Sequence, residues 1–301
     1  MSHRFSALLA ALLLAAGGAL TWTARPDRDV NMSAVGELWA DIFRDADSFG
    51  LQLTRVSARE EMDLGRRIAA RIVRANTTVP MWEVYVNTVG QSVARHAGRK
   101  DIRYEFHVIA APARNAFSLP GGQIFLYTGL LEQMKTEAEL AGVLGHEIAH
   151  VDRRHCIERF QYRMRLRKLG LDDIGPLVQI GRSLLTVGYS QYQELEADSE
   201  GLRMSLAEGY DPNGVIDLFA RLFAGSGRPR DPRTPLEEMA RMAGSVLTDY
   251  FRSHPPTAER MRRLTALVRS HSGIRVYRGV ENLRGKVARQ RKEFPGEFIR
   301  L

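Results

Sequence analysis

The segment His146-Glu147-Ile148-Ala149-His150 constrains the fold of this chain more than any other. A helix places residues four apart on one face, so its two histidines can bind a single metal ion. Glu147 lies beside them, where it can act as the general base for a water molecule; this is the H-E-x-x-H arrangement. The plainer alternative is a helix whose histidines are only solvated or hydrogen-bonded.

A zinc site with two histidines needs a third protein ligand. The 301 residues include one cysteine, Cys156, so a carboxylate is the natural candidate. A predicted helix over 191–208 contains Glu194, Glu196 and Asp198. Glu194 and Asp198 share a helix face and Glu196 points away, so one of the pair can bind the metal while the other orients a ligand histidine. An acidic, solvated helix face is the alternative.

The helix that contains the two histidines is predicted to begin at Thr136, where Thr136 and Glu139 form a capping box, and to run past His155. On such a helix His155 lies five residues after His150 and faces elsewhere. We therefore expect a surface histidine or one bonded to a loop. Cys156 has no partner at a spacing that supports a nucleophile, so a structural or incidental thiol is expected.

The rest of the chain predicts further helices and a small sheet. Apolar residues at helical spacing follow Ser57, and a second such stretch covers 81–96. Alternating residues predict a strand over 102–109, and two glycines lead into a short apolar strand over 123–127. The pattern favours a mostly helical α+β protein.

Residues 1–24 are interpreted as a signal peptide or an N-terminal anchor. An uninterrupted run of 14 Ala, Leu and Gly residues covers 7–20. This run fits a signal-peptide core and is short for a membrane span, so secretion is favoured over an uncleaved anchor. In either case we expect the remainder of the chain in the periplasm or elsewhere in the cell envelope.

Basic residues exceed acidic ones, 43 against 35, which gives a formal net charge of +8. Such an excess suggests nucleic acid as a partner, but neither aromatic platforms nor a recognisable binding module accompanies it. We therefore expect no nucleic-acid binding. Solvated helix faces, or attraction to the anionic headgroups of a membrane surface, account better for the charge.

Several motifs occur together in one order between about residues 57 and 270, and they resemble the HtpX/CAAX-protease (Ste/Oma-like) superfamily of gluzincin zinc metallopeptidases. The resemblance is greatest to the periplasmic BepA-like branch, here without its C-terminal repeat domain. The motifs are His146–His155, Glu194-x-x-Ala197-Asp198, His254-Pro-Pro-Thr-Ala-Glu-Arg260, Asn115–Gly122, Tyr127–Leu131 and Gly209–Pro212.

The resemblance implies a gluzincin fold with one Zn²⁺ per chain. His146, His150 and Glu194 would be the zinc ligands, and Glu147 the general base and acid. Asp198 would hold His146.

The stretch Asn115–Tyr127 would provide a sheet edge strand that lines the active-site cleft and grips an extended substrate by its backbone. The substrate-binding residues implied there are Asn115, Gly122, Ile124 and Phe125. His254 and Arg260 would face the active site as catalytic residues that stabilise the tetrahedral oxyanion. Alternatively, His254 occupies the fourth zinc position and holds the enzyme shut.

The implied organisation is a metallopeptidase domain over 57–270, with an insertion at 225–251 and a mobile lid at 159–189. An N-terminal extension covers 25–56, and 271–301 is expected to be a basic tail. The function implied is a zinc-dependent endopeptidase of the bacterial cell envelope, whose substrates are unfolded, misfolded or misassembled envelope proteins. The alternative is a latched or inactive protease-fold protein that serves as a periplasmic assembly factor or chaperone.

Overall fold

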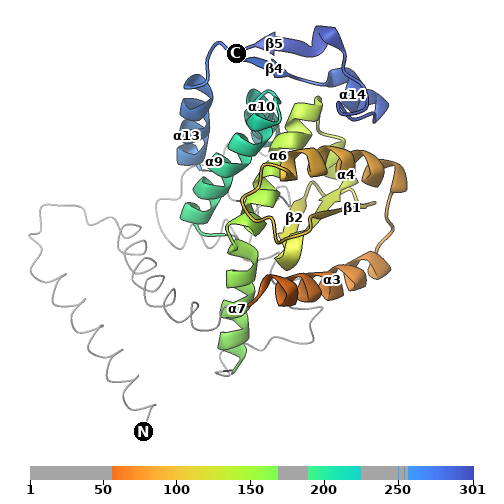
Figure 1. The fold of residues 1–301 in the computed structure, drawn as a ribbon, viewed down its shortest axis with the longest axis vertical. Coiled ribbons are helices and arrows are strands. Elements are labelled where there is room, and N and C mark those ends of the chain that lie inside the picture. The colour runs from red at the N-terminus through yellow and green to blue at the C-terminus, as the bar shows by residue number, and fades with distance from the viewer. Residues whose placement is uncertain (1–55, 169–188, 225–249, 251–253, 255–256) are drawn as a thin grey trace, which may run out of the picture. The chain divides into compact units, whose positions relative to one another are not determined.

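The computed structural model describes residues 56–168, 189–224, 250, 254 and 257–301, all within one unit that covers 55–301 (Figure 1). The predicted signal peptide, nearly all of the extension at 25–56, most of the lid and all of the insertion at 225–251 except Tyr250 lie outside these residues. The helices are α3 Ala58–Ala75, α4 Pro80–Ala94, α5 Thr128–Leu131, α6 Glu137–Asp152, α7 His155–Lys168, α9 Gln191–Ala207, α10 Asn213–Ala224, α13 Ala258–Arg269 and α14 Val280–Gly285, with short 3-10 turns η1 Pro120–Gly122 and η2 Pro295–Glu297. The strands are β1 Glu105–Ile109, β2 Ala116–Leu119, β3 Gln123–Tyr127, β4 Arg275–Tyr277 and β5 Phe298–Arg300.

Helices α6 and α9 lie against each other at the centre of this unit (Figure 1). Two glycines allow their backbones to approach closely. A Cβ atom added to Gly201 would lie 2.6 Å from the backbone nitrogen of His146, and one added to Gly145 would lie 2.5 Å from the carbonyl oxygen of Gly201. This contact sets the acidic side chains of α9 beside the histidines of α6.

The three-stranded sheet has the order β1-β3-β2, with β1 parallel and β2 antiparallel to β3. The central strand β3 is therefore paired on both sides, and β2 is an edge strand. Gly121 and Gly122 make the tight turn from β2 to β3 with positive φ angles of 74° and 88°. The mostly helical α+β class is confirmed.

Two predicted helix starts differ in how they are capped. Ser57 and Glu60 form the complete capping box at the start of α3. At α6 the Thr136 side chain accepts from the backbone N–H of Glu139, but the Glu139 carboxylate accepts from the N–H of Lys135 instead. The cap of α6 is therefore only half of the predicted box.

The prediction that one helix runs past His155 is wrong. Helix α6 ends at Asp152, and a new helix, α7, begins at His155. Between them Arg154 adopts a left-handed conformation with φ of 66°, which interrupts the α-helical path. The helix is therefore interrupted immediately before His155.

The C-terminal segment is not the unpatterned tail that its basic composition suggests. Strands β4 and β5 pair antiparallel, and Val276 and Tyr277 are buried. The carbonyl oxygens of Arg278 and Gly279 accept hydrogen bonds of 3.0 Å from the first two N–H groups of α6. Residues 271–301 thus satisfy donors that a helix start leaves unpaired.

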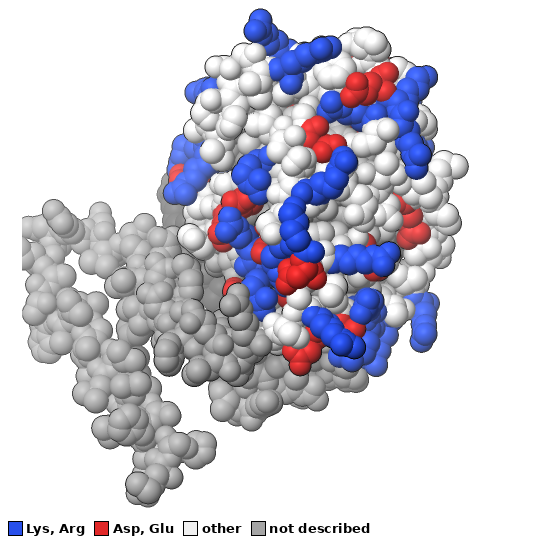
Figure 2. Space-filling model, viewed as in Figure 1, with Lys and Arg blue, Asp and Glu red and all other residues white. Residues whose placement is uncertain are grey.

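Charged side chains of both signs are interspersed over the face shown in Figure 2. Within the described residues, several basic side chains lie beside acidic neighbours, such as Arg263 with Glu259 at 2.7 Å and Arg284 with Glu281 at 2.6 Å. Much of the positive charge is therefore neutralised locally. No helix in the described part of the chain is both long and apolar enough to cross a membrane.

Candidate active site

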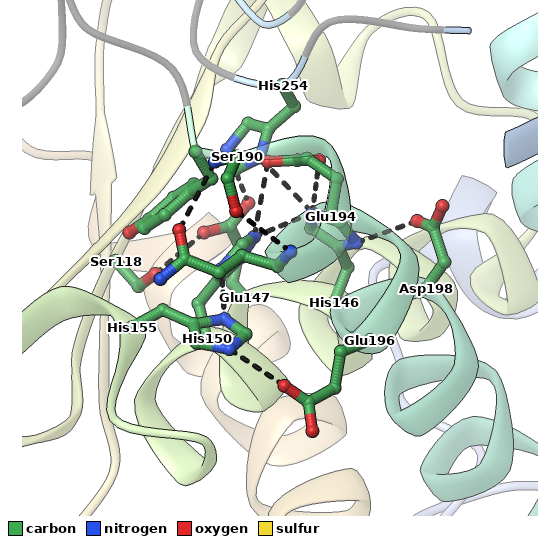
Figure 3. A network of polar contacts seen from close by, with 12 residues as sticks. Ser118, His146, Glu147, His150, His155, Ser190, Glu194, Glu196, Asp198 and His254 are labelled. Carbon is green, nitrogen blue, oxygen red and sulfur yellow. Dashed lines mark hydrogen bonds and ion pairs between the residues drawn. The ribbon is translucent and has the colours of Figure 1, made fainter. Parts of the chain in front are cut away.

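Four side chains from three parts of the chain converge at the α6–α9 contact (Figure 3). His146 and His150 come from α6, Glu194 from the first turn of α9, and His254 from the segment before α13. All four are buried, and one potential ligand atom from each lies within 4.8 Å of the others. The structure therefore brings together the three predicted zinc ligands and places His254 beside them, as in the predicted alternative of a fourth ligand.

The spacing of these atoms fits a tetrahedral metal site. The Nε2 atom of His146 lies 3.0 Å from Nε2 of His150, 3.2 Å from Nδ1 of His254 and 3.5 Å from Oε2 of Glu194. Ligands at 2.0–2.1 Å from zinc stand about 3.3 Å apart in a tetrahedron. Nitrogen and carboxylate donors are also the types that zinc accepts, so this set can hold one zinc ion.

Asp198 and Arg260 contact the predicted ligands His146 and Glu194. Asp198 Oδ1 lies 3.0 Å from Nδ1 of His146, which is the contact predicted for it. The guanidinium of Arg260 donates two bonds of 2.7 Å to Asp198 and one of 3.2 Å to the carbonyl of His254, and it lies 2.7 Å from Oε2 of Glu194. These partners occupy Arg260, so in this arrangement it neutralises two carboxylates rather than facing an oxyanion.

The same guanidinium helps to keep Glu194 ionised. Burial alone would raise the pKa of Glu194, but Arg260, together with the contacting His146 and His254, outweighs burial and holds the pKa well below the usual value. Glu194 is thus available as a charged ligand even though only 1% of its surface is exposed. Arg260, on α13, provides the positive charge that this buried carboxylate requires.

Glu147 is fully buried beside the cluster, and both of its oxygens have close neighbours. Its Oε2 accepts a hydrogen bond of 2.9 Å from the Ser118 hydroxyl on β2. Its Oε1 lies 3.3 Å from Nε2 of His254, whose other nitrogen, Nδ1, lies 3.0 Å from Oε1 of Glu194. The His254 ring therefore lies between the predicted base and the metal ligands, and Tyr250 stacks on it at 4.8 Å between ring centres.

The expectation for His155 is wrong, because the helix break turns it back toward the site. It is 3% exposed, and its Nδ1 lies 3.0 Å from Nδ1 of His150. Its Nε2 lies 3.0 Å from Glu196, the acidic residue of α9 that points away from the metal site (Figure 3). His155 is neither exposed nor bonded to a loop.

The predicted substrate residues lie in different settings. Ile124 and Phe125 lie on β3, which pairs on both sides, so their backbone is not free to bind a peptide. The prediction fails for these two because the edge strand is β2. Asn115 and Gly122 flank β2 and are buried.

Several residues at the site were not predicted from sequence as functional. They are Ser118, Tyr189, Glu196 and His155. Tyr189 precedes Ser190, which forms a capping box with Gln193 and so marks the start of α9 in the sequence. The Tyr189 ring stacks on His150 at 3.7 Å between centres. Burial raises the pKa of Cys156 to about 12, in keeping with an inert thiol.

Two metal-facing histidines and a glutamate on one helix, with a carboxylate ligand from a second helix, define a zinc metallopeptidase of the gluzincin kind. Comparison with known families agrees with this class. The model described as peptidase family M48 matches residues 80–268, and the chain belongs to that family.

Similar proteins include two named mitochondrial metalloendopeptidase OMA1. The one from Schizosaccharomyces pombe is 32% identical over 60% of this chain and 51% of its own length, and the one from Arabidopsis thaliana is 32% identical over 60% and 35%. A protein from Yersinia pestis named beta-barrel assembly-enhancing protease is 27% identical over 56% of this chain and 38% of its own. The chain thus spans about half of these relatives, or less.

Proposed function

We propose that this chain is a zinc endopeptidase of the bacterial cell envelope that hydrolyses misfolded or misassembled envelope proteins. The observation that carries the peptidase assignment is the buried Glu147 carboxylate directly beside the cluster of His146, His150 and Glu194. The envelope assignment is supported by the apolar run at 7–20 and by the similarity to proteins named beta-barrel assembly-enhancing protease.

The proposed mechanism uses Glu147 as the proton carrier. Zinc, when bound, supplies Lewis-acid chemistry that polarises the scissile carbonyl and lowers the pKa of water to about 7. Glu147 takes the proton of the attacking water and delivers it to the leaving amine. Because Ser118 holds Oε2, the oxygen that carries the proton is Oε1, which faces the position now taken by His254.

The substrate is proposed to lie extended along β2. Among the described residues this strand pairs with β3 alone, and Ser118 on β2 contacts the catalytic base. A peptide added to the other side of β2 would bind through its backbone, which tolerates many sequences, as removal of misfolded proteins requires. Asn115 and Gly122, at the two ends of β2, remain the proposed flanking contacts.

His254 is proposed to keep the enzyme latched in this conformation. Its Nδ1 is one of the four clustered ligand atoms, so it occupies the coordination position that a catalytic zinc site keeps open. Cleavage then requires His254 to move away. The same observation favours the second candidate, a permanently latched protein that serves as an assembly factor or chaperone.

Digestion of unfolded casein by wild type, His254→Ala and the double variant His254→Ala/Glu147→Gln tests these proposals. A latched peptidase predicts faster cleavage by His254→Ala than by wild type, and cleavage by the double variant about 100- to 10,000-fold slower than by His254→Ala. Absence of cleavage by both wild type and His254→Ala would overturn the proposal that the protein is a peptidase and favour the second candidate, an assembly factor or chaperone. Cleavage by His254→Ala that is slower than by wild type would overturn the proposed latch and favour a role for His254 in stabilising the oxyanion.

The envelope location and substrates need their own test. We expect fractionation of cells that produce the full chain to recover it outside the cytoplasm, in the periplasm or at a membrane surface. Envelope proteins that persist when the gene is deleted should be cleaved by the purified His254→Ala variant. Recovery of the chain in the cytoplasm would contradict the envelope assignment while leaving the zinc peptidase intact.

A further inference from the structure

The zinc ligand His150 has two ring nitrogens that face different surroundings. Its Nε2 faces the metal cluster, 3.0 Å from Nε2 of His146 and 3.6 Å from Glu194. Its Nδ1 faces away and lies 3.0 Å from Nδ1 of His155. His155 in turn places its Nε2 3.0 Å from Oε2 of Glu196. A continuous chain of polar contacts thus runs from a carboxylate through two imidazoles to the metal position (Figure 3).

The direction of the hydrogen bonds along this chain follows from its outer end. The Glu196 carboxylate can only accept, so Nε2 of His155 carries a proton. In a neutral His155 ring the other nitrogen, Nδ1, then has the free lone pair and accepts from His150. His150 must therefore carry its proton on Nδ1, which leaves the lone pair of its Nε2 directed at the metal.

We propose that His155 and Glu196 are positioning residues that fix the tautomer and ring orientation of the zinc ligand His150. The proposal rests on the zinc site and does not depend on which proteins the enzyme cleaves. The Nδ1 atom of His146 contacts a carboxylate directly, that of Asp198 at 3.0 Å, whereas Nδ1 of His150 reaches the Glu196 carboxylate through the imidazole of His155.

Neighbouring residues hold the contacts between Glu196, His155 and His150 in place. The break at Arg154 is what allows His155, the first residue of α7, to face His150. Arg153 lies 3.5 Å from the outer oxygen of Glu196 and so steadies that carboxylate. Tyr189 stacks on the His150 ring with an interplanar angle of 17°, which restricts the ring from its flat side. Three helices, α6, α7 and α9, thus each contribute one member of the chain.

The test compares zinc affinity, measured by competition with a chromophoric chelator, among four single variants of the full chain. His155→Phe keeps the ring but removes the acceptor, and we expect zinc affinity to fall roughly 10- to 100-fold. His155→Asn keeps an acceptor near the Nδ1 position and should recover most of that loss. Glu196→Leu should weaken zinc binding, while Glu196→Gln, which retains an acceptor oxygen, should stay close to wild type.

A matched control comes from a second histidine–glutamate pair remote from the metal cluster. His96 lies 2.9 Å from Glu208, so His96→Phe removes a similar contact and should leave zinc affinity unchanged. The absorption spectrum of the Co²⁺-substituted protein gives a second readout, and we expect the ligand-field bands to change in His155→Phe but not in His155→Asn.

Two results would overturn the proposal. One is zinc affinity of His155→Phe equal to wild type with an unchanged Co²⁺ spectrum. The other is an equal loss of affinity in His155→Asn and His155→Phe, since a purely packing role predicts no rescue by an acceptor. If His155→Phe fails to fold, the comparison of Glu196→Leu with Glu196→Gln decides. Equal zinc affinities in that pair would contradict the proposed positioning role of Glu196 and His155.

Discussion

At the scale of single residues, the Glu147 carboxylate depends on a neighbour that has no part in the H-E-x-x-H pattern. The Ser118 hydroxyl donates to Oε2 at 2.9 Å in a buried environment, where a hydrogen bond to a charged group is worth about 1.5–3 kcal/mol. Ser118 thus orients this carboxylate and, in the proposed mechanism, leaves one oxygen for the proton. This contact also ties the strand β2 to α6.

Substituting Ser118 by alanine should therefore slow peptide hydrolysis without loss of zinc. We expect kcat to fall roughly 10- to 100-fold, the rate equivalent of losing that hydrogen bond. Steady-state kinetics with a peptide substrate and zinc analysis of the same sample measure both quantities. Ser92→Ala is the matched control, because Ser92 is buried and its hydroxyl donates to the carbonyl of Val89 within the same helix. Equal kcat values for the two variants would rule out the orienting role.

Helix periodicity predicted that His146 and His150, and likewise Glu194 and Asp198, share a helix face. The choice of Glu194 rather than Asp198 as a metal ligand came from the family resemblance. Ser118 and His155 could not be predicted in the same way. Ser118 reaches Glu147 only through the pairing of strands, and His155 only through a helix break at an arginine whose positive φ no local signal announces.

At the scale of elements, the site depends on the close approach of α6 and α9. Gly145 and Gly201 permit this approach. In the sequence alone, a glycine within a helix indicates only a weaker helix and not a close contact with another helix. A Cβ atom at Gly201 would lie 2.6 Å from the backbone nitrogen of His146. Because that neighbour is backbone, it cannot move aside as the tip of a flexible side chain could.

We expect Gly201→Ala to push α9 away from α6 and so to weaken both the fold and the metal site. Overpacking of this kind costs about 1–3 kcal/mol of the free energy of unfolding, and zinc affinity should fall because Glu194 moves with α9. Thermal unfolding and chelator competition measure the two effects. Gly296→Ala serves as the control, since nothing lies within 4 Å of a Cβ there. If Gly201→Ala unfolds and binds zinc as wild type does, the helix contact is not what sets the site.

At the scale of the whole described unit, the C-terminal segment supports the catalytic helix from its far end. Arg278 and Gly279 accept from the first N–H groups of α6, and Arg289 donates its backbone N–H to Glu137 at 2.9 Å. The sequence offered no periodic pattern in 271–301, because these short strands and turns are fixed by hydrogen bonds to distant residues. The basic composition pointed instead to a solvated tail.

Asn282 tests whether this segment contributes to stability. It is fully buried; its side chain donates to the carbonyls of Val287 and Lys292 at 2.7 Å each and accepts from the Tyr277 hydroxyl at 2.6 Å. Asn282→Ala leaves these partners unsatisfied, so we expect a loss of about 2–4 kcal/mol and a Tm lower by roughly 5–12 °C. The exposed Asn87→Ala is the control. An unchanged Tm in Asn282→Ala would show that 271–301 contributes little to the fold.

The most direct test of the account combines zinc content with peptide hydrolysis in Glu147→Gln. If His146, His150 and Glu194 hold the metal and Glu147 moves the proton, wild type and variant should each contain one zinc per chain. The variant should cleave peptides about 100- to 10,000-fold more slowly than wild type, and the same ratio should hold in a His254→Ala background. Wild-type rates in Glu147→Gln, or purified wild type without zinc, would contradict the central claim.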